Sequence, residues 1–238
     1  LSGADLTRVR AQRVDFRGAD ATDVEAEGAD FRDSHWAGAR MSDSNFVGAN
    51  FSGADLSDAE IARADFSNAN FEGATLCGLE LHESLMLGAS FRRANLEYAS
   101  LECMILPDVD FTGANLHRGQ LTGSVIPDGQ MLDANLTQAE LADVSWEHAD
   151  LRGADLRGAS FHAGTTRDGV KVGVQPPGWE HPPIYPDDEI AQDYLPPEAI
   201  RKANLCGVDL RNAKIDGVDF YLVDLRHAKY DADQAEYL

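Results

Sequence analysis

Every fifth residue of this chain, in one unbroken phase from Leu1 to Phe161, is large and apolar except Ala11, Ala21 and Ala26. A small residue, usually alanine, stands two positions before the large one, as Ala49 stands before Phe51. A period of five fits neither an α-helix, with 3.6 residues per turn, nor a strand, in which side chains alternate. A short repeat kept in one phase is typical of a stacked solenoid, in which each unit packs on its neighbours.

The repeating motif reads Ala, then Asp or Asn, then Leu or Phe, then two variable residues, as in residues 49–53 and 154–158. It resembles the pentapeptide-repeat family over about four fifths of the chain. The resemblance implies an all-β fold, a right-handed quadrilateral β-helix with four pentapeptides in each coil. It also implies that the large residue and the small residue two before it point inward, while the other three positions face water.

Residues twenty apart should then stack, because four pentapeptides make one coil. Two ladders of like side chains support this spacing, since stacked strands favour like neighbours. One is a phenylalanine ladder and the other a leucine ladder: Phe31, Phe51, Phe71, Phe91 and Phe111; Leu56, Leu76, Leu96, Leu116, Leu136 and Leu156. We expect about eight uninterrupted coils over residues 1–161, or roughly 40 Å at a strand spacing of ~4.8 Å.

The phase breaks at a segment rich in proline, residues 162–202. Within it, residues 165–172 predict a small hairpin around an Asp-Gly turn, and residues 197–201 predict one helical turn. Repeats resume in a new phase over residues 203–230, enough for about one and a half further coils. Residues 231–238 predict a short terminal helix that caps the open core, with Asp231 or Asp233 as its N-cap.

Two functions are open for the insertion. It is either a structural flap over one side of the prism or a loop that binds a partner, with aromatic residues as anchors. Those aromatic residues are Trp179, Tyr185 and Tyr194.

Charge is distributed unevenly over the four predicted faces. The chain has 41 acidic and 20 basic residues and a formal net charge of −21. Over residues 1–161, the face centred on Met41, Ile61 and Leu81 sums to −7, and the next, centred on Phe46, Phe66 and Leu106, sums to −6. We call these the first and second acidic faces. The phenylalanine face sums to 0 and the leucine face to −2.

An apolar patch is expected on the second acidic face, at outward positions twenty residues apart. It consists of Leu85, Leu87, Ile105, Pro107, Val125 and Pro127. An exposed apolar patch needs a cover. Three covers are open: the insertion folded back, a second copy of the chain in a homodimer, or another partner. We expect these residues to be less exposed than other outward positions.

The remaining sequence features exclude several classes of function. Three cysteines and seven histidines show no metal-binding spacing. No nucleophile–base constellation and no phosphate-binding glycine loop is visible, so we expect neither catalysis nor a cofactor. The acidic balance argues against direct nucleic-acid binding, and no apolar run reaches transmembrane length, so we expect no membrane partner. Sparse thiols favour a reducing compartment, which predicts a cytoplasmic protein.

The start of the chain carries one further expectation. Leu1 is already in register with the repeat, and no initiator methionine precedes it. A first coil without a cap would expose the end of the hydrophobic core. We therefore expect a segment to precede Leu1.

Two functional hypotheses follow. The first is a rigid protein-interaction scaffold whose partner the sequence does not name. The second is a DNA mimic, since members of the pentapeptide-repeat family that protect DNA gyrase, a type II topoisomerase, are implied to occupy its DNA-binding surface. The coils of residues 1–161 carry a net charge of −15 over roughly 40 Å, or about one net charge per 2.7 Å of axis. B-DNA carries one charge per ~1.7 Å of axis. The chain departs from gyrase-protecting relatives because its first coils carry no projecting loop and its insertion is long and near the C-terminus.

Overall fold

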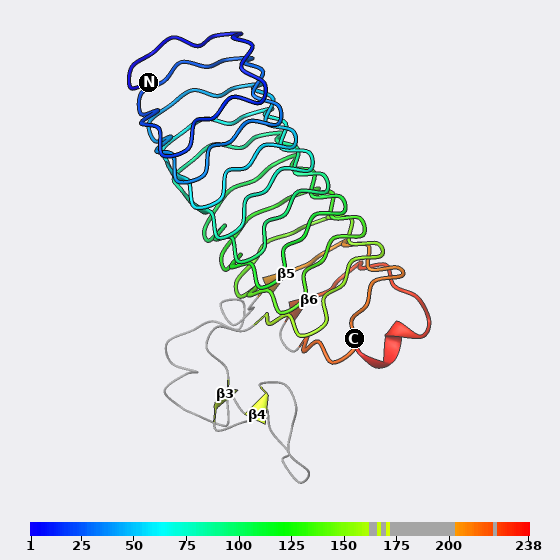
Figure 1. Ribbon diagram of the computed structural model, residues 1–238. Helices are drawn as coiled ribbons and strands as arrows, with labels where there is room; N and C mark the ends of the chain where they lie inside the picture. Colours follow the sequence, from blue (N-terminus) through cyan, green and yellow to red (C-terminus); the bar gives the residue numbers. More distant parts are fainter. Residues whose placement is uncertain (162–165, 168–169, 172–202, 221–222) are drawn as a thin grey trace, which may run out of the picture.

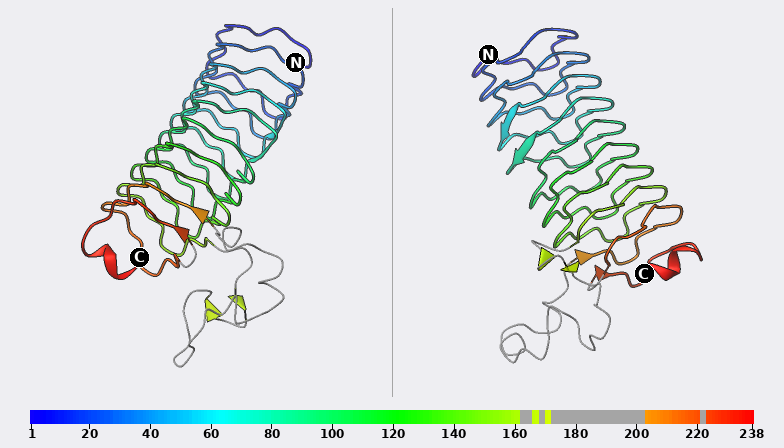
Figure 2. Two further views of the ribbon diagram at one scale, coloured as in Figure 1. Left: turned by 180° about the vertical axis from the view of Figure 1, so that it is seen from behind. Right: turned by 60° about the horizontal axis from the view of Figure 1, so that its bottom comes forward.

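The computed structural model describes residues 1–161, 166–167, 170–171, 203–220 and 223–238. The chain winds into a long, straight four-sided β-helix with its two ends at opposite ends of the prism (Figure 1). Both further views show the same stack of coils, with the C-terminal residues across its last coil (Figure 2).

Parallel bridges join residues that are twenty apart in the sequence, beginning with Asp5 and Glu25. Before the insertion a bridge recurs at every fifth residue except between Leu85 and Ile105, so each coil has four sides. On the phenylalanine face, for example, the Phe51 N–H donates to the Asn70 carbonyl at 2.7 Å, and the Asn70 N–H donates to the Ala49 carbonyl at 2.9 Å. The backbone groups of one coil are thereby satisfied by the coils on either side of it.

Regular strands are short because each side of the prism is only a few residues wide. Strand β1, Glu60–Ala62, pairs in parallel with β2, Glu80–His82. Strand β5, Ala203–Asn204, pairs in parallel with β6, Val223–Asp224.

Two further strands bear on the predicted hairpin. Strand β3, Thr166–Arg167, is antiparallel to β4, Val170–Lys171, which agrees with the hairpin expected over residues 165–172. The helical turn predicted at residues 197–201 lies outside the described residues, as do the three aromatic residues of the insertion.

Each corner is a tight turn with a left-handed residue. At residues 51–54 the Ala54 N–H donates to the Phe51 carbonyl at 2.9 Å, and Gly53 has φ +67°. Glycine adopts this conformation without steric cost. Other corners place non-glycine residues there, such as Asp58 with φ +55°. Asparagine and aspartate tolerate this region better than other side chains do.

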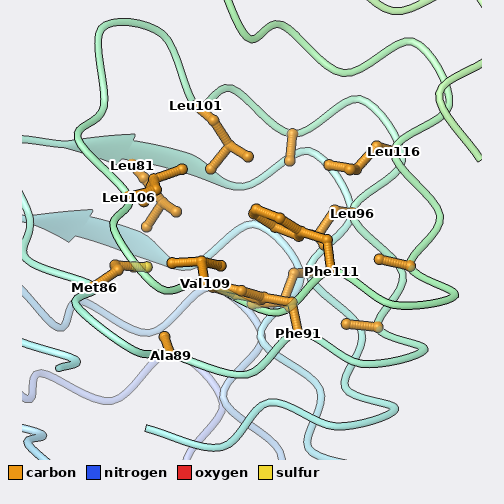
Figure 3. Packing of buried hydrophobic residues seen from close by; sticks show 14 of the residues in the cluster. Leu81, Met86, Ala89, Phe91, Leu96, Leu101, Leu106, Val109, Phe111 and Leu116 are labelled. Carbon is orange, nitrogen blue, oxygen red and sulfur yellow. The ribbon is translucent and has the colours of Figure 1, made fainter. Parts of the chain in front are cut away.

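Stacked side chains fill the interior. Adjacent rings of the phenylalanine ladder lie nearly parallel, and Phe71 is 5.3 Å from Phe51 and 5.0 Å from Phe91, measured between ring centroids. Figure 3 shows Phe91 and Phe111 packed with Met86, Leu96 and Leu106 from neighbouring sides. The residues of the leucine ladder are fully buried. Inward alanines fill the gaps, because a narrow prism has room for one large side chain per side of each coil.

The stack continues across the insertion. Ser145 bridges to Asn204 and Ser160 bridges to Asp219, so the partners are 59 residues apart where other partners are 20 apart. Thirty-nine residues are therefore inserted into one coil while the ladder itself is kept. Phe161, on the first acidic face, is the last described residue before the insertion, and the described chain resumes at Ala203 on the second acidic face.

The C-terminal residues contain a single 3₁₀ turn, η2, Gln234–Glu236. Asp233 occupies its N-cap position, but the Asp233 side chain makes no capping hydrogen bond. The predicted capping by Asp233 is therefore not seen, and the Asp231 carboxylate instead accepts from the Asn212 N–H at 2.6 Å. The buried Gln234 attaches the turn to the last coil, since its amide donates to the carbonyls of Leu210 and Ala213, each at 2.8 Å.

Candidate functional site

The two acidic faces carry most of the net negative charge of residues 1–161, −7 and −6 against 0 and −2 on the other two faces. Outward positions of the first acidic face carry Asp23, Glu60, Glu83, Glu102 and Glu140, all of them exposed. Outward positions of the second add the exposed Glu25, Glu27, Asp108, Asp128 and Glu147. These side chains project from turns and strands whose central residues are buried, so the backbone holds them in fixed columns.

Most arginines lie elsewhere and are used within the chain. A recurring Asp-x-Arg triplet places its aspartate and arginine on either side of an inward-facing central residue, so both side chains face outward from the same strand. Arg157, for example, donates to both carboxylate oxygens of Asp155, at 2.9 and 2.7 Å. The same arrangement joins five other pairs: Arg17–Asp15, Arg32–Asp30, Arg152–Asp150, Arg211–Asp209 and Arg226–Asp224.

Five of the six pairs lie on the phenylalanine and leucine faces, which they neutralise locally. Ion pairs on the acidic faces before the insertion include Arg40–Asp20 and Arg63–Asp43. Each of these two joins adjacent coils of the first acidic face. The pairing within this triplet was not predicted from the sequence, although the triplet itself recurs six times there.

The triplets lower the pKa of their carboxyl groups. Hydrogen bonds from the Arg157 side chain lower the pKa of Asp155 to about 2, against partial burial, which raises it. The Arg157 N–H and the Lys214 ammonium also lower this pKa. Because the folded pKa lies below the unfolded value, the pair stabilises the folded state above about pH 4, and this contribution is lost as the pH falls towards 2.

We expect Arg157→Gln to raise the pKa of Asp155 from about 2 towards its ordinary value of 3.8, since the charge-assisted hydrogen bonds are lost. Carbon-13 NMR titration of the carboxyl groups between about pH 1 and pH 6 would measure this shift. Arg152→Gln is the matched control and should leave Asp155 unchanged, because Arg152 pairs with Asp150. A native Asp155 that titrates near 3.8 would contradict the expectation.

A shallow depression lies at the corner between the leucine face and the first acidic face. Ser42, Asp58, Ile61, Gly78 and the two strand residues Glu60 and Glu80 are among the residues that line it. Its carboxylates attract cations and accept hydrogen bonds, but the lining offers no histidine, lysine or cysteine to activate a nucleophile. In the described ranges, no group of three or more histidine, cysteine and acidic side chains is arranged to hold a metal ion.

The apolar patch is less covered than expected. Leu85, Leu87 and Ile105 are 61%, 48% and 68% exposed. Pro107, Val125 and Pro127 are partly buried. The expectation of reduced exposure is therefore not met for the first three within the described part of the chain. The prolines have a local explanation as well, because proline suits the second position of a turn.

The cysteines occupy outward positions, and the described residues contain no disulfide among them. Cys77 is partly buried and accepts a hydrogen bond from the Asn95 amide at 3.0 Å; burial raises the pKa of its thiol. None of the helical structure in the described residues is long and apolar enough to span a membrane.

The chain is similar to known proteins in its sequence and in its fold. A family model for pentapeptide repeats matches in eight copies, over residues 1–35, 27–61, 54–86, 89–126, 131–163 and 200–229. No curated protein sequence matches the chain.

Several solved structures are similar. HetL, a pentapeptide repeat protein involved in heterocyst differentiation regulation from the cyanobacterium Nostoc sp. strain PCC 7120, is 23% identical, with 92% of this chain and 87% of HetL covered and a TM-score of 0.47. Full-length QnrB1, a plasmid-mediated fluoroquinolone resistance protein, is 20% identical, with 95% of each chain covered and a TM-score of 0.35. A pentapeptide repeat protein from the cyanobacterium Cyanothece 51142 is 23% identical, with 66% and 84% covered and a TM-score of 0.20.

The family match spans most of the chain, and the parallel ladder of coils agrees with it. The predicted fold class, a right-handed β-helix, is confirmed. The chain belongs to the pentapeptide-repeat family.

Proposed function

We propose that this protein is a non-enzymatic, rigid scaffold that binds a basic protein partner through its two acidic faces. Its prism would comprise about eight uninterrupted coils, the proline-rich insertion, and about one and a half further coils. The observation that carries the proposal is the segregation of charge: arginines neutralise the other two faces through short-range pairs, and these two faces retain their carboxylates.

The architecture supports this role in two ways. Backbone hydrogen bonds between successive coils fix the columns of outward side chains, so a partner meets a preorganised surface and little order is lost on binding. Carboxylates arrayed on one side produce a field that attracts a basic partner and speeds its association at low salt.

The test compares the native protein with a variant carrying Glu60→Gln, Glu102→Gln and Glu140→Gln, all on the first acidic face. Partners captured at about 50 mM salt should be recovered about tenfold less with this variant, because long-range attraction falls with each neutralised charge. The matched control neutralises three acids on the other faces, Glu72, Glu97 and Asp133. Equal recovery by both variants would overturn the proposal.

A second candidate is an acidic DNA mimic that binds DNA gyrase or another type II topoisomerase. One observation favours it: acidic residues follow the first acidic face along much of the prism, from Asp20 to Asp143. In a supercoiling assay with purified gyrase, a mimic would inhibit the enzyme, and the triple glutamine variant would inhibit it less. Full supercoiling activity at saturating protein would exclude this candidate.

A further inference from the structure

The apolar patch on the second acidic face contains three exposed large apolar side chains on adjacent coils, Leu85, Leu87 and Ile105. We call Leu85, Leu87, Ile105 and Val125 the apolar stripe. Leu106, the central residue of the middle stripe coil, points into the core (Figure 3), and the adjacent Ile105 is 68% exposed. Other large apolar side chains with substantial exposure occur singly or near the chain ends, such as Tyr98 and Tyr237.

Much of the backbone under the stripe is hydrogen-bonded within the prism. The Leu106 N–H donates to the Val125 carbonyl at 2.8 Å, and the Val125 N–H donates to the Met104 carbonyl at 2.9 Å. The Leu85 carbonyl accepts from the Phe66 N–H at 2.8 Å. Further coils pair with the stripe on both sides, through Asp65 and Ser145, so the stripe is not at a sheet edge. Strand addition needs such an edge, so a partner does not bind here by adding a strand. Docking must use side chains.

Carboxylates surround the stripe. Glu83 stands at one corner, Asp108 and Asp128 stand at the other, and Asp65 and Glu147 occupy the coils on either side. The three pentapeptides that carry the stripe contain no lysine or arginine. A second copy of the chain would bring the same acidic border against itself, and like charges brought together oppose association. Charge complementarity favours an apolar partner surface bordered by basic residues.

The spacing of the stripe suits an α-helix laid along the prism axis. Apolar residues on one face of a helix recur about every 5.4 Å, one turn, while successive coils are about 4.8 Å apart. Across three coils the two spacings diverge by only about 1.2 Å. Lysine or arginine on either side of the apolar helix face would reach the corner carboxylates.

We propose that the apolar stripe docks an amphipathic helix of a partner protein, with apolar residues on the stripe and basic residues against the flanking carboxylates. This proposal rests on the scaffold function and specifies the chemistry of its partner. The acidic faces supply attraction at long range, and the stripe supplies a contact that persists when salt screens the charges.

The experiment uses a fluorescent synthetic helix of about 18 residues, with leucine at i, i+3, i+4 and i+7 and lysine on both flanks. Its affinity for the intact protein is measured by fluorescence anisotropy at about 50 and 300 mM salt. A peptide of the same composition in scrambled order measures attraction by charge alone. The protein variant is Leu85→Ser with Ile105→Ser, and Tyr98→Ser on the leucine face is the matched control. Serine suits the sites, because Ser100 and Ser145 occupy equivalent outward positions.

At the higher salt concentration, we expect the native protein and Tyr98→Ser to bind the amphipathic peptide at least about tenfold more tightly than the double variant does. Equal affinity of native and double-variant protein would overturn the docking proposal and leave the acidic scaffold standing. Two other results would also overturn it. One is a native dimer, detected by sedimentation, that the double variant abolishes. The other is peptide binding that appears only when residues 163–201 are replaced by a linker, because the insertion would then cover the stripe.

Discussion

Replacing Phe71 by alanine is expected to lower the free energy of unfolding by about 3–5 kcal/mol. Phe71 is 1% exposed and lies between Phe51 and Phe91, with interplanar angles of 8° and 4°. The substitution removes apolar contacts to both coils and leaves a cavity that the hydrogen-bonded backbone of the prism cannot close. Urea unfolding followed by circular dichroism would measure the loss from the shift in midpoint.

Phe71→Leu is the matched control, since leucine fills the equivalent interior position on the leucine face. We expect it to cost less than about 1.5 kcal/mol, because most of the volume is kept. A solenoid is stabilised by contacts between neighbouring units, so a cavity in the middle also weakens the coupling between its two halves. An alanine variant as stable as the leucine variant would show that the ladder contributes little, contrary to its stacking geometry.

The inward and outward sense of nearly every residue in the first coils was predictable from the sequence. One periodicity was enough because a coil of fixed length places each fifth residue at the same depth. Phe31, Leu56 and Leu136 are fully buried, as the ladders predicted. The repeat also assigns every outward residue to one of the four faces. The concentration of negative charge on two of these faces could therefore be predicted from the sequence.

Three features depended on partners that the repeat does not encode. The Asp-x-Arg pairs form where an aspartate and an arginine of opposite charge face outward from the same strand. The net charge of a face does not show which of its charges are paired. The exposure of Leu85 and Ile105 depends on what covers them, and most of the insertion lies outside the described residues. The attachment of the C-terminal turn by Gln234 depends on carbonyls in the last coil, to which this single glutamine donates.

Buried serines are a fourth such feature. Ser34, Ser44, Ser84 and Ser124 occupy inward positions where alanine is usual. Two of them receive hydrogen bonds from the backbone of the preceding coil: Val24 N–H donates to Ser44 Oγ at 2.9 Å, and Ala64 N–H to Ser84 Oγ at 3.3 Å. The other two accept the indole N–H of a buried tryptophan. Each serine is therefore explained by a donor nearby, which periodicity alone could not identify.

The serine beside Trp146 gives the second large effect. Trp146 is fully buried on the second acidic face, and its Nε1–H donates to Ser124 Oγ, in the preceding coil, at 3.1 Å. Ser124→Ala removes the acceptor and leaves the indole N–H without a partner in an apolar interior. We expect a loss of about 2 kcal/mol in the free energy of unfolding, since an unsatisfied buried donor costs ~1–3 kcal/mol.

A double-mutant cycle separates this hydrogen bond from packing. Trp146→Phe removes the indole N–H, so Ser124→Ala in that background should cost only the small difference between two neutral side chains. The coupling energy between the two positions is then about 1–2 kcal/mol. If Ser124→Ala costs the same in both backgrounds, the serine acts through packing and the hydrogen bond is incidental. A measured coupling would instead show that Ser124 stabilises the fold by accepting the hydrogen bond from Trp146. Polar residues inside this prism would then occur where a buried donor needs an acceptor.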